Sequence, residues 1–487
     1  MSGLVGAEST GARVELEPVI GLEIHVQLLT RTKMFCSCAL SFGEPPNTRT
    51  CPVCLGLPGS LPVVNERAIH YGLMIGMALG SELAPRSIFH RKNYFYPDLP
   101  KGYQISQYDE PLCLGGDLDG VRIHRVHLEE DAAKLTHVGS TGRIQGSSRS
   151  VVDFNRGGTP LAEIVTEPDI RTAEQASDWL KLLRATLRRL GVSNVNMDEG
   201  SLRCDANISL RPAGTTTLGT KTELKNMNSF RFIERGINAE IARQRGLIES
   251  GGKVVQETLH FDPASDRITS LRSKEEAHDY RYFPDPDLIP VAITPDMLEA
   301  ARAAMPELPA ARAERFEREL GLSADTAHQL AFRGELGDFF EAGLPHTEHV
   351  QQLGIWVTGE LVRHLGDADP ASSRLRPAAL AALVELVAAR KVTQTAAKDV
   401  LGELVDAGGD PAAVIAARGL GAIDDAGELT GIVAAAVAAN PDAAEKIRAG
   451  NRKAIGAIIG QVMRQTKGRA DGGEITRLVL EQLGLDG

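Results

Sequence analysis

The chain has 487 residues, the composition of an ordinary soluble globular protein and a formal net charge of −11. Its length exceeds what one hydrophobic core supports, so we expect about three domains. The acidic balance excludes a protein covered in basic patches for indiscriminate nucleic-acid binding but is compatible with one local basic surface. Because the segment before Pro18 lacks the features of a secretory signal and no later stretch stays apolar for the width of a bilayer, we expect a cytoplasmic protein with no membrane partner.

Residues 20–28 show the alternation of a half-buried strand. Every even position is apolar, whereas Glu23 and His25 share the other face, where their side chains leave the strand about 6.5 Å apart. Carboxylates with one imidazole suit a hard cation such as Mg²⁺. Other strand-like segments offer further candidate ligands, namely Glu129 or Glu130, Glu163 and Asp205. On this pattern alone, a solvated strand face without a metal is the commoner explanation.

Four of the six cysteines crowd into one short segment as two pairs, Cys36 with Cys38 and Cys51 with Cys54. In a reducing compartment, such clustering favours a metal over disulfides. Four thiolates on tight turns can surround Zn²⁺ tetrahedrally and leave no position for a substrate, so we predict a structural zinc site. The alternative is four reduced thiols in a small core, which the loop, rich in Pro, Asn and Gly, does little to provide.

Basic and aromatic side chains interleave between residues 91 and 109, although aromatic residues make up only 5% of the chain. A nucleotide pocket needs this mixture, with cations for the phosphates and rings for stacking. An aromatic core edge with basic side chains reaching to solvent explains it equally well. The chain has no G-x-x-x-x-G-K-[ST] phosphate loop, no G-x-S-x-G elbow and no H-E-x-x-H motif, which argues against the common nucleotide-binding loop and against serine or zinc hydrolases.

Further strands are predicted around residues 121–131, 150–157, 160–167 and 201–211. Two helices interrupt them. The first starts at Thr172, where Gln175 completes a capping-box signature, and the second runs from about Ser229 to Gly251. Many strands with few helices indicate an α+β domain on a mainly antiparallel sheet.

The pattern becomes helical after a boundary near residue 293. Residues 377–391 have the spacing of an amphipathic helix, and Gly-Gly-Asp-Pro ends the preceding helical region near residues 405–411. The tail that follows is predicted to be a small helical domain. Its section from 440 to 469 is rich in basic residues, namely Lys446, Arg448, Arg452, Lys453, Arg464, Lys467 and Arg469. By charge alone this is either a solvated helix face or a nucleic-acid surface.

Several long motifs occur together in order along nearly the whole chain, among them VIGLEIHVQL, the two cysteine pairs, RKNYFYPDLPKGYQISQYD, HLEEDAAK, DFNRGGTPLAEIVTEPDIR and MDEGSLRCDANISLR. In this respect the chain resembles the B subunits of tRNA-dependent amidotransferases. The resemblance implies a catalytic cradle domain at 18–293, an all-α domain at 294–408 and an all-α, tRNA-binding tail domain at 409–487. Residues 1–17 form an extension without an evident match and are a candidate for disorder.

The resemblance also implies ATP-dependent conversion of Glu-tRNA(Gln), Asp-tRNA(Asn) or both into the corresponding amide. An amidase (glutaminase) subunit would supply ammonia, and a small third subunit would bridge the two. By matching motifs, Glu23, His25, Glu130 and Glu163 are expected to hold Mg²⁺, the four clustered cysteines to hold Zn²⁺, and Asp205 to join the active face. Arg91 and Lys92 are our own selection for the phosphates of ATP, and the basic tail becomes a candidate tRNA surface. A competing hypothesis is a zinc-stabilised RNA-binding scaffold without chemistry.

Overall fold

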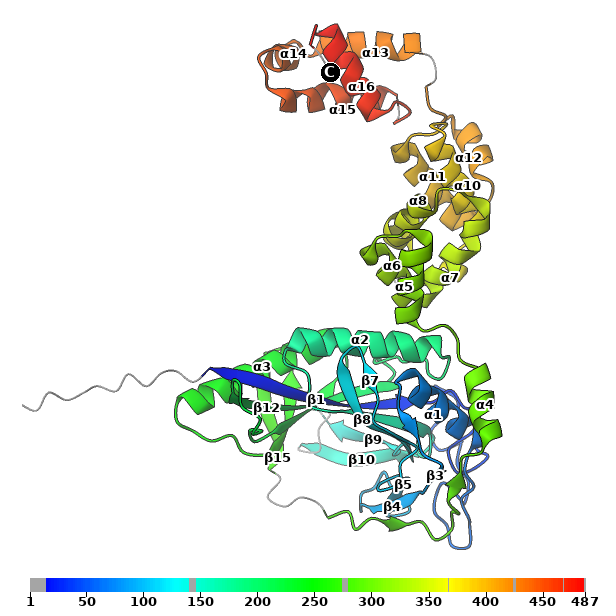
Figure 1. Cartoon of the computed structure of the whole chain (residues 1–487), viewed down its shortest axis with the longest axis vertical. Coiled ribbons are helices and arrows are strands. Elements are labelled where there is room, and N and C mark those ends of the chain that lie inside the picture. Colours follow the sequence, from blue (N-terminus) through cyan, green and yellow to red (C-terminus); the bar gives the residue numbers. More distant parts are fainter. Residues whose placement is uncertain are drawn as a thin grey trace, which may run out of the picture. The chain divides into compact units, whose positions relative to one another are not determined.

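The computed structural model describes residues 15–139, 146–273, 279–366, 368–423, 426–466 and 468–485. They form two compact units that divide between Leu308 and Pro309 (Figure 1). Of the predicted N-terminal extension, residues 1–14 lie outside the described residues. No helix in the described part of the chain is both long enough and apolar enough to cross a membrane.

The first unit is built on a ten-stranded sheet. Its strands are β1 (Leu16–Gln27), β2 (Glu82–Leu83), β6 (Cys113–Leu114), β7 (Asp117–Leu118), β8 (Val121–Glu130), β11 (Pro160–Thr166), β12 (Leu202–Pro212), β13 (Thr222–Met227), β14 (Glu257–Asp262) and β15 (Arg267–Ser273). They are ordered β15-β14-β13-β12-β1-β11-β8-β6-β2, with β7 paired to β8. Only the β13–β14 pair is parallel, so the prediction of a mainly antiparallel sheet is confirmed.

Three smaller sheets complete the strands of this unit. They consist of β3 (Arg86–Ser87) with β17 (Val291–Ala292), β4 (His90–Asn93) with β5 (Tyr103–Ser106) and β16 (Phe283–Pro284), and β9 (Lys134–Gly139) with β10 (Ser147–Asp153). The β4 sheet joins the basic and aromatic segment near residue 91 to a stretch almost 200 residues later in the chain.

Helices cover one face of the large sheet and leave the other to polar side chains. The apolar even-numbered residues of β1, from Ile20 to Val26, are buried in one core with side chains of three helices. Those helices are α1 (Glu66–Ala78), α2 (Ala173–Arg189) and α3 (Phe230–Glu249); α2 and α3 lie across the sheet in Figure 1. The predicted cap of α2 is present, because the side chain of Thr172 accepts a hydrogen bond from Gln175 N. Ser229, near which the second helix was expected to begin, caps α3 by accepting a hydrogen bond from Phe232 N.

Helix α1 was not expected from the sequence. The side chain of Asn65 caps it by accepting hydrogen bonds from Arg67 N and Ala68 N. It packs against α4 (Pro295–Ala303), whose Ala301 is buried in the core of the sheet. The first unit therefore continues to Leu308, fifteen or so residues beyond the composition change near residue 293.

The second unit is helical, as predicted, and holds two separate groups of buried apolar residues. Its helices are α5 (Pro309–Leu320), α6 (Ala324–Phe332), α7 (Gly334–Gly343), α8 (Val350–Ile355), α9 (Val362–Leu365), α10 (Pro377–Ala388), α11 (Gln394–Ala407), α12 (Pro411–Arg418), α13 (Ala426–Ala439), α14 (Pro441–Arg448), α15 (Ile455–Gln465) and α16 (Gly472–Gln482). The expected amphipathic helix is α10, which buries Leu380 and Leu383. The sequence pattern grouped helix α12 with the tail. In the structure its Ile415 is buried in the apolar group that contains Leu380 and Leu383, whereas the other apolar group begins at Leu429.

Candidate active face and cysteine cluster

The neighbours of β1 in the sheet bring the candidate ligands together. His25 lies directly opposite Glu163 of β11, and Glu23 lies directly opposite Asp205 of β12. Residues that are directly opposed on antiparallel strands project from the same face of a sheet. All four side chains therefore stand on the face that the helices do not cover, which we call the active face.

The imidazole of His25 lies between three carboxylates. Its Nε2 is 3.4 Å from Oε2 of Glu163, 3.8 Å from Oε1 of Glu23 and 3.9 Å from Oε1 of Glu129. The side chains of Glu129 and Glu163 are 4% and 7% exposed, whereas those of Glu23 and His25 reach solvent. Buried carboxylates at such spacing require positive charge among them. Several carboxylate oxygens with one imidazole form a donor set that fits Mg²⁺.

The protonation behaviour of these groups follows from their crowding. Burial, together with the neighbouring Glu163, raises the pKa of the Glu23 carboxyl above its ordinary value. Burial opposes the charge of Glu163 too, but the two histidines beside it outweigh burial and hold the pKa of its carboxyl well below the ordinary range. Burial likewise lowers the pKa of His25, yet the carboxylates, led by Glu163, raise it on balance. The protonation of each group on this face therefore depends on its neighbours, and a bound cation would reduce the repulsion between the carboxylates.

Glu129, rather than Glu130, joins this group. Successive residues of a strand point to opposite faces, so the two neighbours on β8 cannot both face the imidazole of His25. The carboxylate of Glu130 instead forms an ion pair with Lys101 and accepts a hydrogen bond of 3.0 Å from Ile105 N. Of the two carboxylates that the strand pattern left open, the structure brings Glu129 to the active face. It does not bring Glu130, the residue selected by family resemblance.

His127 is a further member of the active face that was not selected from the sequence. It lies opposite Glu163 in the β8–β11 pair, and its Nε2 is 3.3 Å from Oε2 of that residue and 3.8 Å from Oε2 of Glu129. Burial lowers the pKa of His127, but the two carboxylates outweigh burial and raise it to about 9. The signal was present, because His127 and Glu129 stand two apart on a strand just as Glu23 and His25 do.

Asp205 lies at the border of the active face and already has a cationic partner. Its Oδ2 is 2.7 Å from Nζ of Lys225, whose Nζ is also 3.0 Å from Oε1 of Glu223. Burial opposes the charge of Lys225, but Asp205 and Glu223 outweigh burial and raise its pKa. Beside Glu23 the face therefore continues as a carboxylate–ammonium network across β12 and β13.

The two candidate phosphate contacts, Arg91 and Lys92, point in different directions because they are neighbours on β4. The guanidinium of Arg91 is held by carboxylates, with Nε 2.9 Å from Asp285 and Nη2 2.8 Å from Asp287. Burial lowers the pKa of Lys92, but the nearby charges, led by Glu129 and including Glu163, raise it on balance, so its ammonium lies within range of the charges on the active face. The structure therefore brings Lys92 to the candidate ligands and gives Arg91 a structural ion pair.

Tyrosine rings border Lys92. Its Nζ lies 4.9 Å from the ring centre of Tyr280. That ring packs edge to face with Tyr282, which stacks on Tyr108 at 4.4 Å with an interplanar angle of 9°. The aromatic segment noted in the sequence is thus completed by residues from the far end of the first unit.

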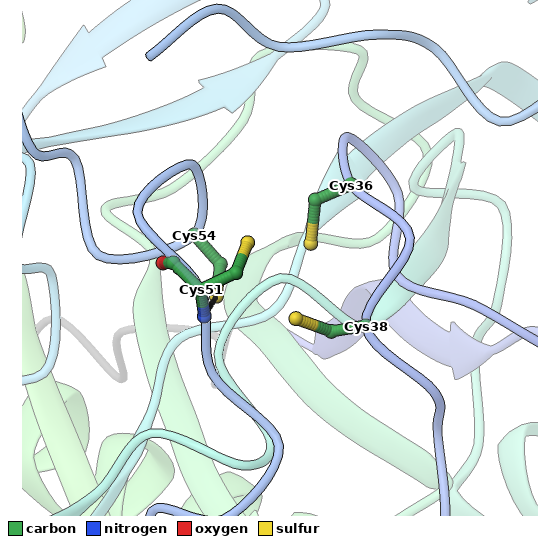
Figure 2. Close-up of side chains that lie close together, drawn as sticks. All are labelled: Cys36, Cys38, Cys51 and Cys54. Atoms are coloured by element: carbon green, nitrogen blue, oxygen red, sulfur yellow. Dashed lines mark hydrogen bonds between the residues drawn. The ribbon is translucent and has the colours of Figure 1, made fainter. Parts of the chain in front are cut away.

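The four clustered cysteines come together as predicted (Figure 2). Their sulfur atoms all lie within 4.8 Å of one another, and Figure 2 shows the side chains of Cys36 and Cys38 pointing toward those of Cys51 and Cys54. A hydrogen bond from Cys36 and the nearby Lys33 ammonium, 3.7 Å from Sγ, lower the pKa of Cys54 to about 4. Convergent sulfurs with a thiolate among them fit tetrahedral Zn²⁺. Cys113 and Cys204 are buried separately, as expected.

Basic side chains project from the tail helices. Lys446 and Arg448 lie in the last turn of α14, Arg452 and Lys453 in a short 3₁₀ helix (Arg452–Ala454), and Arg464 in the last turn of α15. All five are exposed, and the structure records no ion pair for any of them within the part of the chain that it describes. Arg469 is half-buried and donates from Nε to Thr466 O, and Lys467 lies outside the described residues.

Two family models match this sequence. Residues 18–299 match the GatB/GatE catalytic domain, and residues 338–483 match the GatB domain. The chain is 48% identical over 485 residues to the B subunit of the aspartyl/glutamyl-tRNA(Asn/Gln) amidotransferase of Anaeromyxobacter dehalogenans, a match that covers 96% of this chain and 99% of the relative. Proteins of the same description from Frankia casuarinae and Geobacter sulfurreducens are 49% and 47% identical, over 96% of this chain and 96% and 99% of those relatives.

Proposed function

This chain belongs to the family of tRNA-dependent amidotransferase B subunits, and we propose that it converts misacylated Glu-tRNA(Gln), Asp-tRNA(Asn) or both into Gln-tRNA(Gln) and Asn-tRNA(Asn) at the expense of ATP. A side-chain carboxylate resists ammonia because it is anionic and would have to expel oxide. In the proposed reaction its oxygen first attacks the γ-phosphorus of ATP and ADP leaves. Ammonia then attacks the acyl carbon and phosphate leaves, so that a carbon–nitrogen bond replaces the carbon–oxygen bond.

The active face is the observation that carries this proposal. Glu23, His25 and Glu163 form a donor set for Mg²⁺, with Glu129 beside His25 as a fourth candidate, and the ion when bound would supply positive charge for phosphate oxygens. In this set Glu129 takes the place that the resemblance gave to Glu130. Lys92, whose pKa is raised by Glu129 and Glu163, would add a second positive charge for the transferred phosphoryl group. Phosphoryl transfer requires positioning and charge rather than a protein nucleophile.

Asp205 and Lys225 extend the proposed site along β12 and β13. Their ion pair of 2.7 Å lies next to Glu23 and places an ammonium within the sheet face. We propose that this border receives the polar end of the aminoacyl group, for which paired donors and acceptors are suited. The cysteine cluster is proposed to hold a structural Zn²⁺, because four sulfurs leave no coordination position for a substrate.

The tail is proposed to bind tRNA. Its exposed basic residues, for which no ion pair is recorded among the described residues, offer phosphate contacts, which give affinity but little sequence information. Recognition there would then depend mainly on the backbone and shape of the RNA.

The proposed complex contains further subunits, in keeping with the description of the relatives as B subunits. An amidase (glutaminase) subunit would release ammonia from glutamine, and a small third protein would bridge it to this chain. The assembly would be a heterotrimeric carbon–nitrogen ligase that works in the cytoplasm, where misacylated tRNAs are made.

The test replaces Glu163 by Gln and compares the variant with Glu174→Gln, an exposed change on α2. With misacylated tRNA, ATP and glutamine supplied to the reconstituted complex, Glu163→Gln should abolish ATP-dependent amidation while tRNA binding survives, and Glu174→Gln should retain both. Unchanged amidation in Glu163→Gln would instead favour an RNA-binding scaffold whose active face has no chemistry. Supplying each misacylated tRNA separately identifies the substrate.

A further inference from the structure

Two histidines, His25 and His127, lie close to the same pair of buried carboxylates. Oε2 of Glu163 is 3.4 Å from His25 Nε2 and 3.3 Å from His127 Nε2. Glu129 is shared in a similar way, because its Oε1 faces His25 and its Oε2 faces His127. Two overlapping sets could in principle hold a metal, one with His25 and the other with His127.

The surroundings of the two imidazoles differ. The His25 side chain is 18% exposed and stands beside the partly exposed Glu23, so a cation and its waters can reach it. The side chain of His127 is only 4% exposed. Magnesium keeps several waters in its coordination shell, and that requirement favours the open side.

Arg125 decides which nitrogen of His127 carries the proton. It lies two residues earlier on β8, and its Nε donates a hydrogen bond of 3.2 Å to His127 Nδ1. A ring nitrogen that accepts a hydrogen bond is unprotonated, so the neutral ring carries its hydrogen on Nε2, toward the carboxylates.

We propose that His127 is a positioning residue and not a metal ligand: its Nε2–H, which faces Glu163 at 3.3 Å, orients this carboxylate toward a divalent cation held on the His25 side, and Arg125 fixes the tautomer of His127. This inference rests on the proposed magnesium-dependent function and specifies how its ligands are held. Arg125 contributes a second contact, with Nη2 3.7 Å from Oε1 of Glu163. Partners of this kind set the orientation of a ligand and tune the affinity for the metal.

The test uses the full-length chain with Mn²⁺ in place of Mg²⁺ and measures nitrogen coordination by pulsed electron paramagnetic resonance. One directly bound imidazole nitrogen is expected. Its signal should vanish in His25→Ala and persist in His127→Gln, in which the amide nitrogen replaces the Nε2 donor. Coupling to two imidazole nitrogens, or loss of the signal in His127→Gln alone, would overturn the proposal.

The affinity for Mn²⁺ gives the second readout. The dissociation constant should rise about 10- to 100-fold in His127→Leu, which lacks a donor, and by no more than about threefold in His127→Gln. Arg125→Met should behave like His127→Leu, whereas Arg125→Lys keeps a donor and should recover most of the affinity. Equal affinities in His127→Leu and the unmodified chain would refute the positioning role. Absence of any Mn²⁺ binding by the unmodified chain would instead contradict the proposed function itself.

Discussion

His25 of β1 and Glu163 of β11 lie directly opposite each other in an antiparallel pair, with Nε2 of the imidazole 3.4 Å from the carboxylate. This relationship depends on the register of two strands that are separated by well over a hundred residues in the chain. A shift of one residue would turn Glu163 to the helix-covered face. The candidate metal site is therefore a property of the sheet, and its members can be tested one at a time.

The two neighbouring carboxylates of β8 should behave differently. Glu129→Gln removes a charged oxygen beside His25, so we expect the dissociation constant for Mn²⁺ to rise at least about tenfold. Glu130→Gln is its matched control, because the carboxylate of Glu130 pairs with Lys101, away from the imidazole. Isothermal titration calorimetry on both variants checks this. A greater loss of affinity in Glu130→Gln would restore Glu130 as the ligand.

Replacing the two neighbouring basic residues of β4, Arg91 and Lys92, should have different effects, one on stability and the other on activity. Arg91→Ala leaves the fully buried Asp285 without its ion pair, at a cost on the order of 3 kcal/mol in the free energy of unfolding. Lys92→Met should change thermal stability little and lower ATP-dependent amidation by about 100-fold, as expected for the loss of one charge from the reacting phosphate. Thermal denaturation and turnover measured on both variants distinguish the roles. A stable but inactive Arg91→Ala would show that Arg91 contacts the nucleotide.

Zinc content tests the cysteine cluster. Elemental analysis should give about one zinc per chain, and the double change Cys51→Ser with Cys54→Ser should remove it and lower the melting temperature. Cys113→Ala is the control, since this buried thiol lies outside the cluster and its loss should leave the zinc in place. A preparation without zinc that melts at the same temperature as the zinc-loaded protein would refute a structural site.

Charge reversal tests the tail. Replacing Lys446, Arg452 and Lys453 by Glu should weaken tRNA binding. It should also flatten the plot of the logarithm of the binding constant against the logarithm of the salt concentration, whose slope changes by about 0.9 for each phosphate that is no longer neutralised. The same number of reversals at Lys181, Arg302 and Arg318, which are exposed on other helices, controls for the change in net charge. Binding measured between low and moderate salt gives both slopes. If the two variants weaken binding equally, only the overall charge matters.

Local signals predicted the elements whose patterns are periodic. The alternation in residues 20–28 predicted β1, the capping box at Thr172 predicted the start of α2, and α3 was expected from about Ser229, where it begins. Helix α1 was missed because the stretch Leu73–Gly76 is buried on successive positions, and a helix that is buried nearly all round lacks an amphipathic period.

The sequence by itself determined that Glu23 and His25 share one strand face and that four cysteines lie close together, because both follow from neighbours within a few residues. Only the tertiary structure decided that Glu129 and His127 join the active face while Glu130 pairs with Lys101. In the same way it decided that Arg91 is held by Asp285, 194 residues away. The physical reason is that side chains alternate along a strand, so the function of each neighbour depends on which face the pairing of distant strands covers.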